Sequence, residues 1–111
     1  MAGLFEELAS LDKLIHEPAR LAILTALSAC QSADFLYLQR LSGLTTGNLS
    51  SHLSKLEEAE LVQIEKQFVG KRPNTQVSLT KQGRVAVDRH WQLLDNLRNG
   101  ALAWEPGEED V

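Results

Sequence analysis

The chain has 111 residues, of which 43% are apolar and 23% are charged, values typical of one ordinary globular domain. Its single cysteine, Cys30, excludes an internal disulfide framework and a four-thiolate zinc site. The uncharged run over residues 21–33 is too short to span a bilayer. Glu6 and Glu7 stand where a secretion signal would carry basic residues. We therefore expect a soluble, cytoplasmic protein with no membrane partner.

The formal net charge of −4 is unevenly distributed along the chain. Residues 1–34 carry a net charge of −3, residues 35–84 a net charge of +3, and residues 85–111 a net charge of −4. Local potential, rather than total charge, attracts a polyanion. The basic middle segment therefore keeps nucleic acid open as a partner, with chance segregation in a short chain as the alternative.

Two helices are expected before residue 30. Residues 4–15 have one apolar face, which predicts an amphipathic helix. That face consists of Leu4, Leu8, Leu11 and Ile15. Pro18 suits the first turn of the next helix, because its missing N–H has no partner there in any case. This second helix, residues 18–29, is apolar on most sides and is expected to be central to the core.

A helix-turn-helix pattern follows. Residues 31–34 predict a turn, and Asp34 is expected to cap a short helix over residues 36–41. Gly43 is a natural stop for that helix. The next helix, residues 45–59, is expected to start at Thr45 or Thr46, since either side chain can cap exposed N–H groups.

From residue 62 the apolar period changes from 3.6 to 2, which predicts a β-hairpin over residues 62–79. Its turn is expected within VGKRPN, residues 69–74. Thr80 should cap a long final helix with an apolar stripe of Val87, Trp91 and Leu94. The acidic tail, residues 101–111, is expected to be disordered.

The helix over residues 45–59 has an unusual composition. Leu49, Leu53 and Leu56 recur at the spacing of one buried helix face. Small neutral polar side chains stand between them, and the first glutamate is Glu57, although exposed helix surface normally carries Glu, Lys and Arg. The pattern favours a hydrogen-bonding surface over the alternative of a turn and a late helix start, which leaves the Ser50-Ser51-His52 run unexplained.

Four stretches carry a resemblance to the small winged helix-turn-helix regulators related to the MarR and ArsR families. They are HEPARLAIL (16–24), LQRLSGLTTGNLSSHLSKLEEAELV (38–62), VGKRPNTQVSLT (69–80) and TKQGR (80–84). The resemblance implies a mainly α fold with a small β-hairpin (α+β), extended by N- and C-terminal helices. It makes residues 1–100 one domain, with a recognition helix at about 45–59, a wing at about 62–79, and terminal helices at about 4–15 and 80–98.

In such regulators the recognition helix enters the major groove, where short Ser, Thr and Asn side chains reach base edges. Carboxylates near its N-terminus would repel the phosphates that the helix dipole attracts. Asn48 is the best placed to read a base, because Asn can pair bidentately with adenine, whereas Ser50 could equally bond its own backbone. The recognition-helix candidates are Thr45, Thr46, Gly47, Asn48, Ser51, His52 and Lys55.

The resemblance also implies contacts from the wing, through Lys71, Arg72 and Asn74. Weaker candidates for anchoring the DNA backbone are Arg40, Lys66, Lys81 and Arg84.

The sequence contains no pattern that indicates catalysis or a cofactor. His16, His52 and His90 stand in separate elements without partners at ligand spacing, so we expect no metal site. No phosphate loop or nucleophile motif is present, and we expect no enzyme activity. Trp91 and Trp104 leave a small-molecule effector open, although core or interface packing is the commoner role of Trp.

The leading hypothesis is a sequence-specific regulator of transcription that binds double-stranded DNA as a homodimer. The alternative is a winged-helix module that binds protein and has no DNA target, which the acidic total charge would favour. Apolar residues of the terminal helices lack a partner within one domain and predict a two-fold interface. They are Leu4, Phe5, Leu8, Leu11, Trp91, Leu94 and Leu97.

Overall fold

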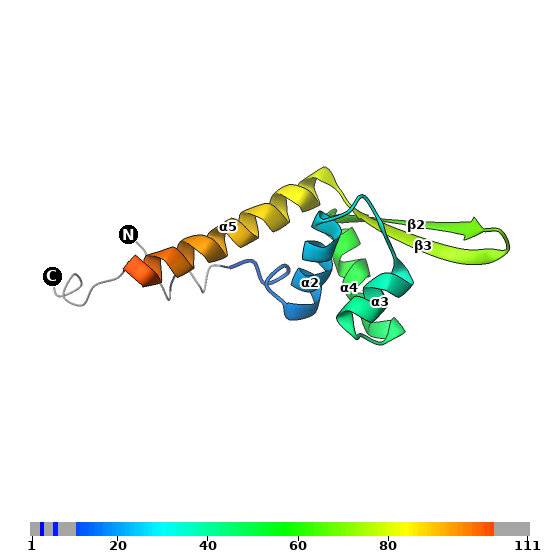
Figure 1. The fold of residues 1–111 in the computed structure, drawn as a ribbon, viewed down its shortest axis with the longest axis horizontal. Coiled ribbons are helices and arrows are strands. Elements are labelled where there is room, and N and C mark those ends of the chain that lie inside the picture. Colours follow the sequence, from blue (N-terminus) through cyan, green and yellow to red (C-terminus); the bar gives the residue numbers. More distant parts are fainter. Residues whose placement is uncertain (1–2, 4–5, 7–10, 104–111) are drawn as a thin grey trace.

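The computed structural model describes residues 3, 6 and 11–103. Its elements in chain order are α2 (Pro18–Ser28), β1 (Ala33–Asp34), α3 (Phe35–Ser42), α4 (Thr46–Glu58), β2 (Val62–Val69), β3 (Arg72–Leu79) and α5 (Lys81–Ala103). Helices α2, α3 and α4 gather at the centre, while the β2–β3 hairpin projects to one side and α5 extends to the other (Figure 1). The expected mainly helical α+β class is confirmed, and no helix within these ranges is long and apolar enough to cross a membrane.

Helix α2 forms the centre of the core. Glu17 caps its start by accepting a hydrogen bond from the Arg20 N–H at 2.8 Å, and Pro18 occupies the first turn as expected. Ile23, Leu24 and Leu27 are fully buried. They pack in one cluster with the apolar stripe of α4 and with residues of the sheet and α5.

The helices α3 and α4 are bounded by the expected capping residues, although α3 extends one residue beyond the expected range at each end. Asp34 accepts from the Leu36 N–H at 2.7 Å, and Gly43 ends α3 in the left-handed region at φ 69°. Thr45 caps α4 by accepting from the Asn48 N–H at 3.1 Å. These boundaries depend on local capping chemistry, which explains why the sequence predicts them.

The sheet has three strands rather than two. Residues 33 and 34, expected only as part of a turn, form β1 and pair antiparallel with β3, so the strand order is β1-β3-β2. A two-residue strand shows no alternation of its own, and the pairing depends on a partner more than forty positions away in the chain. The prediction of a turn at this point was therefore incomplete.

The hairpin turn is tighter than expected. Only Gly70 and Lys71 connect the strands, with Gly70 at φ 66°, and β3 already begins at Arg72. Val69 pairs with Arg72 across this turn, so the next pair, Phe68 and Pro73, is of the non-hydrogen-bonded kind. Pro73 therefore occupies a strand position without removing a hydrogen bond between β2 and β3.

Helix α5 begins as expected but buries a different stripe. Thr80 Oγ1 accepts from the Gly83 N–H at 2.9 Å and donates to the Glu60 carbonyl at 2.6 Å. The buried positions are Gly83, Val87, His90 and Leu97, and of the predicted stripe only Val87 is fully buried. Gly83 lies against the backbone of Leu61, and this contact sets the rotation of the helix.

Both predicted chain ends differ from the structure. Residues 11–17 form bends and turns, so the expected helix over 4–15 does not reach Ile15, while residues 4–5 and 7–10 lie outside the described residues. Asp12 accepts from the Leu14 N–H at 2.8 Å, which favours a turn over a helix. At the other end α5 continues to Ala103, so residues 101–103 are helical where a disordered tail was expected. Residues 104–111 lie outside the described residues.

Candidate nucleic-acid interface

The exposed face of α4 is the central feature of the candidate site. Its stripe of Leu49, Leu53 and Leu56 is buried, so the positions between those residues face outward. Six of the seven candidates from the sequence are exposed: Thr45, Thr46, Gly47, Asn48, Ser51 and Lys55. No carboxylate occurs in α4 before Glu57, and nothing lies within 4 Å of the position that a Cβ on Gly47 would take. The first half of α4 is thus an uncharged, accessible surface of hydrogen-bonding groups.

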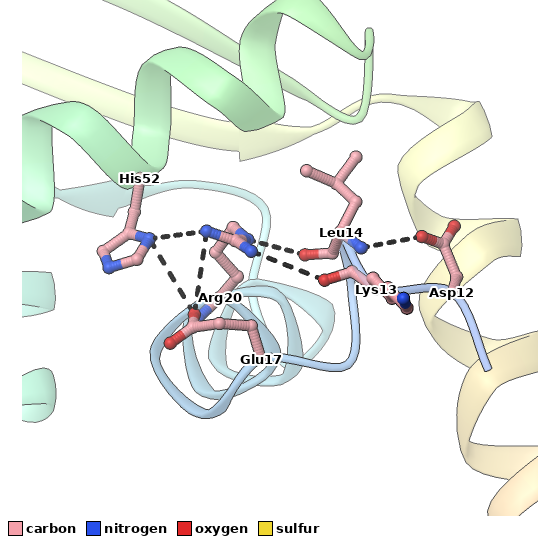
Figure 2. A network of polar contacts seen from close by, with 6 residues as sticks. All are labelled: Asp12, Lys13, Leu14, Glu17, Arg20 and His52. Atoms are coloured by element: carbon pink, nitrogen blue, oxygen red, sulfur yellow. Dashed lines mark hydrogen bonds and ion pairs between the residues drawn. The ribbon is translucent and has the colours of Figure 1, made fainter. Parts of the chain in front are cut away.

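His52 is the exception, because its side chain turns toward α2. Its Nδ1 lies 3.0 Å from Arg20 Nη1 and 3.8 Å from Glu17 Oε2. Figure 2 shows Arg20 between His52 and the chain preceding α2, where the guanidinium also contacts the carbonyl groups of Lys13 and Leu14. The sequence predicts that His52 contacts DNA, and the structure places one edge of its ring in an internal network.

Glu17 has a double role in this network. Partial burial by itself would raise the pKa of its carboxyl, but hydrogen bonds from the Arg20 and Ala19 N–H groups, together with the neighbouring His52 and Arg20 side chains, lower this pKa overall. The carboxylate therefore stays ionised while it caps α2. Its charge also balances the Arg20 guanidinium, at 3.9 Å from Nη1.

The wing exposes its two cations at the tip, whereas the Asn74 side chain is hydrogen-bonded within the fold. Lys71 and Arg72 are exposed, as the resemblance implies. The Asn74 side chain donates to Asp34 Oδ2 at 3.2 Å and accepts from Gln76 at 2.9 Å and from Gln67 at 3.2 Å. Asn74 therefore braces the hairpin against the start of α3, while its part in the DNA-contacting wing stays a prediction.

A hollow separates α4 from the wing. Ser50, Ser54 and Glu57 line it from α4, and Ile64, Lys66 and Thr75 line it from the hairpin. Lys66, a predicted backbone anchor, thus shares this hollow with a carboxylate. Ser50 is exposed at its edge, and its side chain makes no hydrogen bond with the described residues.

The remaining anchor candidates differ in availability. Arg40 on α3 and Lys81 at the start of α5 are exposed. Arg84 donates to the Ser28 carbonyl at 3.1 Å and so ties α5 to the end of α2. Arg84 is nevertheless exposed, and its role as an anchor stays a prediction.

The predicted dimer residues are only partly available. Leu4, Phe5 and Leu8 lie outside the described residues. Leu11 and Leu97 are each only 6% exposed within the single chain, which contradicts the expectation that they lack a partner there. Trp91 remains 42% exposed, although its Nε1 donates to Thr25 Oγ1 at 2.9 Å, and Leu94 is half-buried.

Sequence reasoning missed two residues of this region. Arg20 appears in the sequence as one more charge on an apolar helix, and only its position one turn after Glu17 hints at the cap. Phe68 stands in phase with Val62 and Ile64 in the alternation of β2, yet it is 74% exposed because β2 extends beyond the core. An exposed Phe beside cations can pack on deoxyribose or wedge between base steps in minor-groove binders.

Among the described residues, no group of three or more His, Cys, Asp or Glu side chains could hold a metal ion. Cys30 is half-buried, and its Sγ lies 3.6 Å from the Ala26 carbonyl.

Comparison with known proteins agrees with this arrangement. Residues 19–97 match the family model described as a winged helix DNA-binding domain. An uncharacterized protein from Methanocaldococcus jannaschii is 34% identical over 88 residues, which cover 78% of this chain and 96% of that protein.

Solved structures show the same fold. A transcriptional regulator homologue from Pyrococcus horikoshii has 33% identity and a TM-score of 0.77, with coverage of 88% of this chain and 95% of that chain. A mutant MarR from E. coli, solved in complex with operator DNA, has a TM-score of 0.68 at 23% identity, with coverage of 86% and 66% respectively. The similarity to MarR-type regulators inferred from the sequence is confirmed.

Proposed function

Because this chain belongs to the winged helix DNA-binding domain family, we propose that it is a sequence-specific transcriptional regulator whose helix α4 enters the major groove of double-stranded DNA. Thr45, Thr46, Gly47, Asn48, Ser51 and Lys55 supply the contacts from α4. Lys71 and Arg72 at the tip of the wing hold the neighbouring phosphates. The family and the fold are those of transcriptional regulators, which are not enzymes.

One observation carries the proposal: the exposed first half of α4 has no carboxylate. A carboxylate in the first turn would stabilise the helix through its dipole, typically by 0.3–1 kcal/mol. The chain forgoes this stabilisation and exposes Thr, Gly, Asn and Ser instead. Such a surface suits contact with phosphates and base edges, which a carboxylate would repel.

The test introduces the missing carboxylate. Thr46→Glu at the start of α4 should leave thermal stability equal or higher, yet reduce binding of a random duplex at low salt by roughly tenfold or more, because it places a negative charge against phosphate. Asn99→Asp, which adds the same charge on the exposed surface of α5, is the matched control and should bind as the wild type does.

Mobility shifts at low and high salt, followed by selection of a preferred duplex, measure these effects. If the wild type binds no duplex at low salt, the protein-binding alternative replaces the proposal.

A homodimer completes the proposed function. Trp91 and Leu102 expose apolar surface on α5, which extends beyond the central helices (Figure 1), and such surface usually marks an interface. Two-fold pairing through the terminal helices would set two α4 helices about 34 Å apart, one turn of DNA. Light scattering should therefore give twice the monomer mass, and a monomer at the concentration that binds DNA would overturn this part.

An apolar hollow between α2, α3 and α5 supports a small-molecule effector. Pro18, Leu21, Ala22, Thr25, Ala26, Leu41 and Trp91 line this hollow. A ligand seated there would push on α5 and α3 together and change the spacing of the paired α4 helices. Compounds that release DNA should then change Trp91 fluorescence, and release without any change would exclude this hollow.

A further inference from the structure

Arg20 on α2 connects the chain that precedes this helix with α4. Its side chain is only 11% exposed. Nε donates to the Leu14 carbonyl at 2.6 Å, Nη2 donates to the Lys13 carbonyl at 3.4 Å, and Nη1 lies 3.0 Å from His52 Nδ1 (Figure 2). The two carbonyl groups that precede α2 thus hold the guanidinium so that its Nη1 faces the ring on α4.

This contact determines which nitrogen of His52 carries the proton. A guanidinium has only N–H donors and stays protonated in proteins, so Nδ1 must accept with its lone pair. A neutral imidazole with an accepting Nδ1 carries its hydrogen on Nε2. Glu17 Oε2 lies 3.8 Å from Nδ1, beyond hydrogen-bond distance, and does not compete for this position.

The Nε2 edge of the ring points away from both Arg20 and Glu17 (Figure 2). No described residue accepts a hydrogen bond from it, and the side chain is 20% exposed. Asn48 and Lys55, one turn before and after His52 on α4, are exposed. The Nε2–H group is therefore an oriented donor at the flank of the proposed DNA-binding face.

We propose that Arg20 holds His52 as the Nε2–H tautomer, so that α4 donates a neutral hydrogen bond from this nitrogen to a phosphate oxygen of the DNA backbone. The inference rests on the proposed function and adds a positioning residue, Arg20, that touches no DNA itself. A phosphate offers only acceptors, which a donor edge of fixed direction fits, and donors at the flank of a recognition helix set its register on the duplex.

A neutral donor has a distinct signature in binding. A Lys or Arg contact releases counterions, so its loss lowers the dependence of affinity on salt, whereas the loss of a neutral donor leaves that dependence unchanged. His52→Asn keeps an acceptor near Nδ1 but removes the outward N–H. It should weaken binding to selected and random duplexes alike, by roughly tenfold, at an unchanged salt slope. His52→Gln, whose amide can reach toward the Nε2 position, should recover part of the loss.

Nitrogen NMR of the imidazole ring in DNA-free protein tests the tautomer directly. The wild type should show a protonated Nε2 and an unprotonated Nδ1 at neutral pH. Arg20→Gln should mix the two tautomers and weaken DNA binding about as much as His52→Asn does. The double variant should be no weaker than either single variant, because both remove the same contact. Arg98→Gln, exposed on α5, is the control and should change neither readout.

Four results would overturn the inference: a protonated Nδ1 in the wild type, isotherms unaffected by His52→Asn, a salt slope lowered by about one unit, or a loss confined to one base position. The last two would make His52 a cationic contact or a reader of bases. If the wild type binds no DNA, the proposed function and this contact both fail, while the NMR result still decides the tautomer.

Discussion

At the scale of single residues, the role of each side chain on α4 follows from its distance around the helix from the buried leucine stripe. Asn48 and Lys55 are exposed and make no side-chain hydrogen bond with the described residues, whereas His52 is close enough to α2 to be bound by Arg20. Reading a base requires a free polar group, while holding a phosphate requires charge or a donor.

Asn48 and the wing should therefore respond differently to alanine. Asn48→Ala removes a potential bidentate partner and should cost about 1–3 kcal/mol at one base position, with relaxed preference there. Lys71→Ala and Arg72→Ala each remove a cation, and should weaken binding to all duplexes and lower the salt slope by about one unit. Isotherms on selected and random duplexes at several salt concentrations distinguish the two patterns.

None of these three side chains belongs to the core, so thermal unfolding of the variants should match the wild type. If Asn48→Ala lowers affinity equally at every base position, Asn48 contacts phosphate rather than a base. Unchanged isotherms for all three variants would contradict the DNA-binding proposal.

At the scale of elements, the end of α4 and the start of α5 form one junction. Glu60 takes a positive φ of 62°, and the Leu61 N–H returns to the Leu56 carbonyl at 3.0 Å to close α4. The Thr80 N–H then donates to the Leu61 carbonyl at 3.0 Å. Because Gly83 lies directly against this carbonyl, α5 approaches the junction as closely as a backbone allows.

Gly83→Ala should consequently loosen the junction. Its Cβ would overlap the backbone of Leu61, and relief requires α5 to move, at a cost of about 1–3 kcal/mol or more of the free energy of unfolding. Gly100→Ala, on the same helix with nothing within 4 Å, should instead stabilise the protein by about 0.5–1 kcal/mol. Urea unfolding of both variants provides the comparison, and equal effects would show that the close approach is unimportant.

At the scale of the whole molecule, the segment that precedes α2 is linked to both α4 and α5. Arg20 of α2 bonds both the Leu14 carbonyl of this segment and His52 on α4, while Nδ1 of His16 lies 3.1 Å from His90 Nε2 on α5. Burial lowers the pKa of His90, the charge of His16 lowers it further, and Asp12 opposes this shift in part. The folded state therefore favours a neutral His90.

Stability should decrease on mild acidification for this reason. Above the ordinary His pKa of about 6.5, His90 is neutral in both the folded and the unfolded state. The free energy of unfolding then has its full value. As the pH falls below that value, the unfolded chain takes up a proton first, and stability decreases until the lowered pKa of folded His90 is passed. Urea unfolding from neutral to mildly acidic pH should show this decrease, and His90→Asn should flatten it. A wild-type profile that is already flat in this range would contradict the assignment.

The sequence by itself determined the features that depend on neighbours a few positions away. Caps at Asp34 and Thr45, the stop at Gly43, the stripe of α4 and the cations of the wing tip were predictable, because capping groups and helix or strand periods act within one or two turns. The family resemblance then identified α4 as the candidate recognition helix.

Only the tertiary structure decided the features that depend on segments distant in the chain. The ring of His52 is bound by Arg20, Asn74 by Asp34, and β1 pairs with β3, and in each case the partner stands in another element. The rotation of α5, which buries His90 and leaves Trp91 exposed, follows from the fit of Gly83 against Leu61. A periodic pattern specifies which residues share a face, but the neighbour that covers the edge of that face is known only after the elements have packed.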